Sequence, residues 1–67
     1  MEPTLAEARV LDYLARGKTN REIAQALYIE VCTVKRHLFN VFPKIGASNR
    51  TQAAITWRMR SLLRDVA

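Results

Sequence analysis

The segment from Glu30 to Gly46 constrains the fold more than any other part of this 67-residue chain. On a helical wheel, at about 100° per residue, its apolar side chains gather on one side and its polar and basic side chains on the other. The apolar side collects Val31, Val34, Leu38, Val41, Phe42 and Ile45. The opposite side collects Cys32, Arg36, Phe39 and Pro43, flanked by Lys35, Thr33, His37 and Asn40. We therefore expect one helix that docks through its apolar side and shows outward a surface that carries base but no acid.

A shorter amphipathic segment, 20–27, precedes this helix and is joined to it only by residues 28–30. So tight a connection makes two helices cross steeply and pack against each other. The residues expected in their shared core are Ile23, Leu27, Ile29 and Val34, with Ala24 where the helices come closest. This is a helix-turn-helix pattern, whose second helix suits a DNA major groove. Tyr28 stands where many such turns place Gly to reach a positive φ, so we expect a looser turn.

Two capping boxes fix the starts of the first two helices. Thr4 with Glu7, and Thr19 with Glu22, each pair a hydroxyl that accepts a first-turn amide with a carboxylate that reaches back. Gly17 supplies a left-handed stop between them. These signals place the first two helices near residues 5–16 and 20–27.

The signals are weaker in the second half of the chain. Glu30 stands where a short polar cap is usual, so it supports the helix dipole without capping. Pro43 deletes a backbone amide, and we expect the helix to fray or stop near it. Asn49 with Gln52 is the expected cap of the last helix, with Ser48 as its competitor. The pattern predicts a single all-α domain over residues 1–67, with four helices near 5–16, 20–27, 31–44 and 50–65.

The charge is uneven along the chain. The formal net charge is +5, and the isoelectric point is near 10.2. No acid lies between Glu30 and Asp65, an interval that holds Lys35, Arg36, Lys44, Arg50, Arg58, Arg60 and Arg64. Such segregation favours a phosphate-bearing partner over a solvated surface with mixed charges. Two roles are open for Arg50: it contacts a phosphate at its helix start, or it forms a structural pair with Glu7 or Glu22.

Several classes of protein find no support in the sequence. No apolar run approaches the ~18 residues of a membrane span, and the start is not a signal peptide. The single cysteine, Cys32, excludes a disulfide framework and is compatible with a reducing cytoplasm. No constellation suggests a metal site, a cofactor or catalysis, so we expect no enzyme. Trp57 is expected in the core.

Six short motifs in this order resemble the LuxR-type (GerE/FixJ/NarL) DNA-binding domain of bacterial transcription regulators. They are Thr4-x-x-Glu7-x-x-Val-Leu11, Gly17-x-Thr-Asn-x-Glu-Ile-Ala24, Thr33-Val-Lys-x-His37, Asn40-Val41, Lys44-Ile-Gly46 and Asn49-Arg-Thr-Gln-Ala53. The resemblance covers nearly the whole chain. It implies a four-helix domain whose third helix enters the major groove and whose fourth helix often forms a dimer contact.

Carried over to this sequence, the DNA-facing positions of the family are Cys32, Thr33, Lys35, Arg36, His37, Phe39 and Asn40. Arg36 points most directly outward and is the best candidate for a guanine contact, while Lys35 could reach a base or a phosphate. His37 is either a packing residue or a phosphate donor. Cys32 is most simply a small exposed side chain, with a redox switch as the alternative. Phe39, where the family is commonly polar, could touch a thymine methyl or pack against a partner domain.

These observations predict sequence-specific binding of double-stranded DNA by a cytoplasmic, nucleoid-associated regulator, as the effector domain of a response regulator or quorum-sensing protein. The alternative is a helical protein-interaction module that has lost DNA binding and uses Phe39, Cys32 and Pro43 as an apolar patch. Because the apolar residues of the last helix cover more than one stripe, we expect a homodimer through this helix. Repulsion of Arg58 and Arg60 from their symmetry mates is expected to keep the dimer weak in solution, and DNA to strengthen it. The residues expected at that contact are Ile55, Arg58, Met59 and Leu62. RNA polymerase is a further candidate partner.

Overall fold

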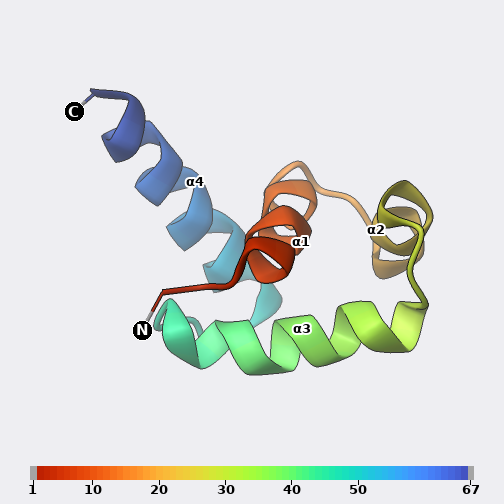
Figure 1. Cartoon of the computed structure of the whole chain (residues 1–67). Coiled ribbons are helices and arrows are strands. Elements are labelled where there is room, and N and C mark those ends of the chain that lie inside the picture. Colours follow the sequence, from red (N-terminus) through yellow and green to blue (C-terminus); the bar gives the residue numbers. More distant parts are fainter. Residues whose placement is uncertain (1, 67) are drawn as a thin grey trace.

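The computed structural model describes residues 2–66, and the side-chain surroundings of residues 2–63. Its helices are α1 (Leu5–Ala15), α2 (Asn20–Leu27), α3 (Val31–Lys44) and α4 (Arg50–Val66) (Figure 1). Every predicted bound lies within one residue of the observed one, and residues 2–66 contain no strand. The prediction of an all-α, four-helix fold is therefore confirmed. Arg64 and Asp65, which we counted in the charge pattern, lie outside the residues whose side chains are described.

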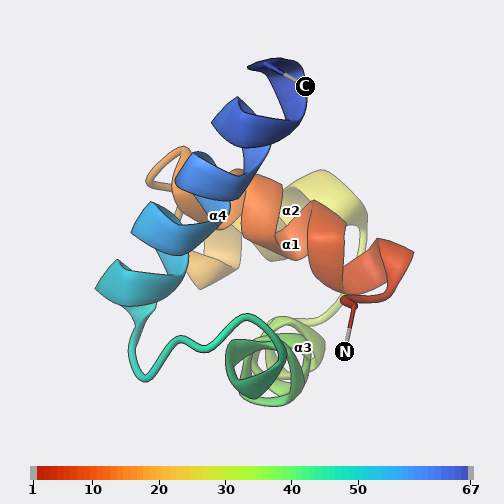
Figure 2. The ribbon, with the colours of Figure 1, turned by 90° about the vertical axis from the view of Figure 1, so that its left-hand side faces the viewer.

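Helix α1 lies at the centre of the arrangement and contacts each of the other three helices. Helix α3 runs along one edge of the molecule, with α2 near its N-terminal end (Figure 1). In the view turned by 90°, α1 and α4 again lie on one side of α3 (Figure 2). The far side of α3 is therefore left uncovered by the rest of the domain.

The helix starts follow the local signals in the sequence. Thr4 and Thr19 each accept a hydrogen bond from the amide three residues on, at 3.2 Å, and both capping boxes are complete. At the start of α4, Asn49 Oδ1 accepts the Gln52 amide at 2.9 Å, while the Gln52 side chain accepts from Ser48 rather than from Asn49. The predicted Asn49 cap is thus confirmed, and Ser48 cooperates with it instead of competing.

The turn between α2 and α3 corrects one prediction. Tyr28 has φ 57° and ψ 44°, so it adopts the left-handed conformation that we expected only of Gly, and the turn is not a looser type. The amide of Ile29 donates to the Ala24 carbonyl at 3.0 Å, and that of Tyr28 donates to Gln25 at 3.4 Å, which is a Schellman motif. The same pair of bonds closes α1 at Gly17 and α3 at Gly46. Tight closure of the helix end, together with the packing of Ile29 on the core, holds Tyr28 in this strained region.

One hydrophobic core joins all four helices. Its buried members are Val10, Leu11, Leu14, Ile23, Ala24, Val34, Leu38, Val41, Ala47, Ala53 and Trp57. The predicted small contact at Ala24 and the core position of Trp57 are both confirmed. Leu27 and Ile29 are partly buried against this cluster, so the shared core of the helix-turn-helix pair is as the sequence predicts.

Candidate nucleic-acid interface

The orientation of α3 about its own axis is fixed by its apolar side. Val34, Leu38 and Val41 are buried, and the three other predicted core residues of this helix, Val31, Phe42 and Ile45, pack partly buried around them. Pro43 is accommodated because α3 ends one residue later, at Lys44, as expected. A helix held along its whole length in this way cannot rotate without losing core contacts. Its opposite side is therefore presented to solvent in one register.

That opposite side carries most of the residues predicted to face DNA. Cys32, Lys35, Arg36, Phe39 and Asn40 are all exposed, and α3 has no acidic residue in its first turn. We call these five residues the outer face of α3. Phe39 is 80% exposed although it is one of the most apolar side chains in the protein. The outer face thus combines two adjacent cations with an exposed aromatic ring.

The remaining two predicted contacts, Thr33 and His37, lie at the shoulder of α3 and are half-buried. His37 lines a small hollow of about 140 Å³ together with Ala6, Arg9, Leu27 and Ile29, where α1, α2 and α3 meet. The imidazole is therefore in contact with the packed interior on one side and accessible on the other. At the helix start, Glu30 makes no side-chain capping bond, as expected, and its carbonyl accepts from Thr33 and Val34.

Three cations of the basic second half are paired with groups of the domain itself. Lys44 Nζ lies 2.8 Å from Glu7 Oε1, and an Arg60 nitrogen lies 2.6 Å from Glu2 Oε1. Arg50 donates to Asn20 Oδ1 at 2.7 Å and to the Lys18 carbonyl at 2.6 Å. A structural role for Arg50 is therefore seen, but the predicted partners Glu7 and Glu22 are wrong. Both carboxylates are already engaged in capping boxes.

Because these three cations are engaged within the domain, fewer cations remain available to an anionic partner. Among the residues whose side chains are described, Lys35, Arg36 and Arg58 are the lysines and arginines after Glu30 that take part in neither an ion pair nor a hydrogen bond between side chains. Two of these three are neighbours on the outer face of α3. Among the described residues after Glu30, the positive charge available to an anionic partner is therefore concentrated there.

The ion pair of Glu7 is largely shielded from water. Glu7 is only 4% exposed, and its Oε1 also accepts the Thr4 amide at 2.9 Å. Burial raises the pKa of Glu7, but the hydrogen bond from Lys44 and that from the Thr4 amide outweigh it and hold this pKa below its usual value. Glu7 therefore stays ionised and ties the end of α3 to the start of α1.

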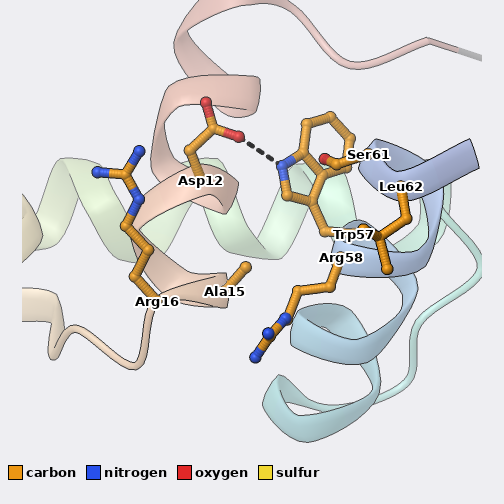
Figure 3. A pocket seen from close by; sticks show the side chains of 7 residues that line it. All are labelled: Asp12, Ala15, Arg16, Trp57, Arg58, Ser61 and Leu62. Atoms are coloured by element: carbon orange, nitrogen blue, oxygen red, sulfur yellow. Dashed lines mark hydrogen bonds between the residues drawn. The ribbon is translucent and has the colours of Figure 1, made fainter. Parts of the chain in front are cut away.

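A second feature is a hollow of about 570 Å³ between α1 and α4 (Figure 3). Its lining residues are Asp12, Ala15, Arg16, Trp57, Arg58, Ser61 and Leu62. Across it, the Trp57 indole N–H donates to Asp12 Oδ1 at 2.7 Å, which joins α4 to α1 (Figure 3). Trp57 is thus buried with its polar atom satisfied. Arg16 and Arg58 extend from the two helices that form the hollow.

The residues predicted for a dimer contact are exposed on α4. Ile55, Met59 and Leu62 are between 55% and 59% exposed, and Leu63 beside them is 67% exposed. Arg58 is exposed among them. Large apolar side chains so close together on one helix form a patch larger than the isolated exposed residues that are ordinary on protein surfaces.

The structure shows neither a membrane helix nor a metal site in the part of the chain that it describes. None of its helices there is both long enough and apolar enough to cross a bilayer. Within the same residues, no three His, Cys, Asp or Glu side chains gather in a way that could hold a metal ion.

Known proteins share both this sequence pattern and this fold. Residues 4–57 match the family of bacterial regulatory proteins, luxR family. The chain is 46% identical over 52 residues to the transcriptional regulatory protein LiaR of Bacillus subtilis, covering 78% of this chain and 25% of that protein. It is 46% identical over 61 residues to the CsgBAC operon transcriptional regulatory protein of Escherichia coli, covering 91% of this chain and 28% of that protein.

A solved structure agrees with these sequence relatives. The crystal structure of the response regulator ChrA, from a heme-sensing two-component system, matches with a TM-score of 0.82 and 35% identity, over 92% of this chain and 31% of that chain. The chain thus spans between a quarter and a third of the length of these relatives. By its sequence and its fold, the chain belongs to the luxR family of bacterial regulatory proteins, and its four helices form the helix-turn-helix DNA-binding domain of that family.

Proposed function

We propose that this chain binds double-stranded DNA in a sequence-specific manner, with α3 in the major groove, as the DNA-binding part of a bacterial transcription regulator. The observation that carries the proposal is the outer face of α3, which is exposed, free of acid and held in one register by the buried side. Lys35 and Arg36 are its charged members. We place the protein in the cytoplasm, where bacterial DNA lies.

Arg36 is the proposed reader of a base. Its guanidinium is planar and presents paired donors, which match the O6 and N7 acceptors of guanine in the major groove. Lys35, on the neighbouring side of the helix, is a compact point charge and is proposed to contact a phosphate. Asn40, Thr33 and His37 lie toward the edges of the outer face and are proposed as further phosphate contacts.

Two copies are proposed to bind one site through α4. A single domain with one recognition helix reads few base pairs, whereas two copies related by a two-fold axis place two such helices on adjacent half-sites. The exposed apolar residues of α4, Ile55, Met59 and Leu62, support this contact. Arg58 would lie near its symmetry mate and weaken association in solution, so we expect DNA to strengthen the dimer by screening this charge.

A salt titration of binding to random duplex DNA tests the proposal. Neutralising phosphates releases counterions, so the affinity of a DNA-binding surface falls steeply as salt rises. Lys35→Gln should flatten the slope of log K against log salt by about 1, because one phosphate contact is lost. Arg16→Gln removes the same charge from the hollow between α1 and α4 and should leave the slope unchanged. Affinity that does not respond to salt, or equal slopes for Lys35→Gln and the native chain, would count against this arrangement.

A further inference from the structure

The outer face of α3 holds a residue whose chemistry neither phosphate binding nor hydrogen-bond readout uses. Phe39 is 80% exposed, and no described cation stacks on its ring, since the cation-π contacts of the described residues involve Tyr13 and Trp57. Burial of a side chain of this size in a contact stabilises that contact by about 1.5–3 kcal/mol, so leaving it in water forgoes that gain. Its position next to Arg36, one turn along the same face, places it where the proposed contact forms.

A phenyl ring has no hydrogen-bond donor or acceptor, which restricts the bases that it could recognise. In the major groove, guanine, adenine and cytosine present polar atoms at their edges, and thymine alone adds an apolar group, the C5 methyl. Phe39 against a polar base edge would strip water from that edge without replacing its hydrogen bonds. When the ring packs against a thymine methyl, both apolar surfaces are removed from water, which stabilises the contact.

The surroundings of Phe39 decide between DNA and a protein partner. Lys35 and Arg36 lie within one turn of it, both exposed. A protein surface that covered Phe39 would also cover these two cations and would have to pair them. The major groove is flanked by the phosphate groups of both strands, and these anions can pair with the two cations. The charge around the ring therefore fits DNA.

On this basis we infer that Phe39 is a specificity-determining residue that packs against the methyl group of a thymine in the bound half-site. The inference rests on the proposed function and adds a particular base to it. Phe39 follows Arg36 by three residues, which is about 4.5 Å along a helix axis, and stacked base pairs are about 3.4 Å apart. The thymine is therefore expected about one or two base pairs from the guanine that Arg36 contacts.

The test replaces thymine by deoxyuridine, which pairs identically and lacks only the methyl group. A duplex is first selected from a random library by the 67-residue chain, and each thymine is then replaced in turn. At one position in the half-site the native chain should bind deoxyuridine about fourfold more weakly, which is the effect of removing one buried methyl group. Phe39→Ala should bind the thymine and deoxyuridine duplexes equally. It should also keep the native salt slope, because no phosphate contact changes.

The matched control is Leu5→Ala, which shortens another highly exposed apolar side chain on a different helix. It should retain the preference for thymine over deoxyuridine. The inference is overturned in either of two cases in which the duplex is still bound. In the first, the native chain binds thymine and deoxyuridine equally at every position. In the second, Phe39→Ala still prefers thymine to deoxyuridine. If no sequence is selected and duplex DNA is not bound, the proposed function fails as well, and the two failures are thus told apart.

Discussion

Replacing Lys44 by Met should destabilise the domain strongly, because it leaves Glu7 as a buried carboxylate with one partner fewer. Glu7 and Lys44 side chains are 5% and 19% exposed, and their ion pair is 2.8 Å long. Exposed ion pairs contribute at most about 1 kcal/mol, whereas breaking a fully buried pair costs about 3–5 kcal/mol. For this partly shielded pair we expect a loss of about 2–3 kcal/mol. A domain of this size has a total stability of about 3–10 kcal/mol, so the melting temperature should fall by about 10–20 °C.

The effect of Lys44→Met should depend on pH with a defined sign. In the native chain the pKa of folded Glu7 is lowered, so its contribution is present above its unfolded pKa of about 4.3 and is lost as pH falls through the folded pKa. Without Lys44 the burial that raises this pKa is opposed only by the bonds from Thr4. The unfolded pKa of Glu7 is the same for both proteins, so the stability difference should be largest near pH 7 and should shrink as pH falls through the folded-state pKa of Glu7 in Lys44→Met towards the lower one in the native chain.

Urea unfolding followed by circular dichroism, at pH 7 and at steps down to pH 3.5, measures both effects. Glu2→Gln is the matched control, since it breaks the exposed pair with Arg60 and should change stability by less than about 1 kcal/mol. The double variant Glu7→Gln with Lys44→Met should recover part of the loss, because the buried charge is gone. An unchanged midpoint for Lys44→Met at pH 7, or a difference that does not vary with pH, would refute the reasoning.

Three further predictions concern the core, the turn and the dimer. Leu38→Ala should cost about 2–4 kcal/mol through the cavity that it leaves under α3, and an unchanged thermal melt would mean that α3 is not held as described. Tyr28→Gly should raise stability by about 0.5–1 kcal/mol, because the relief of left-handed strain exceeds the added entropy of the unfolded chain; a lower melting temperature would show that the Tyr28 side chain stabilises the turn. Leu62→Glu should leave folding intact and abolish two-to-one complexes on a palindromic duplex in analytical ultracentrifugation, whereas a native chain that binds two half-sites strictly one to one would rule out the dimer.

The fold was predictable because its signals are local. Capping boxes, helix periodicity and the short connection at residues 28–30 each act over a few residues, and together they placed every helix within one residue. Tyr28 shows where local rules fail. The preference for Gly at a positive φ is a matter of about 1–2 kcal/mol, and helix closure with packing of Ile29 outweighs it.

The contacts between distant residues were not predictable in the same way. Lys44 and Glu7 are 37 residues apart, and Trp57 and Asp12 are 45 apart. Helix periodicity states which side of a helix is buried, but not which polar side chains meet across two helices. For this reason the exposed face of α3 could be predicted from the sequence. The number of cations available to a partner was overestimated, because Lys44, Arg50 and Arg60 are engaged within the fold.

The central claim, that α3 reads bases through Arg36, is tested most directly by Arg36→Ala on two kinds of DNA. Binding is measured to a selected half-site, to that half-site with each base pair changed in turn, and to random duplex, with Arg16→Ala as the matched control. We expect Arg36→Ala to lose about 1–3 kcal/mol on the selected site and to relax discrimination at one base pair, while random binding changes little. An equal loss on selected and random DNA, with discrimination intact at every position, would make Arg36 a phosphate contact and contradict the account.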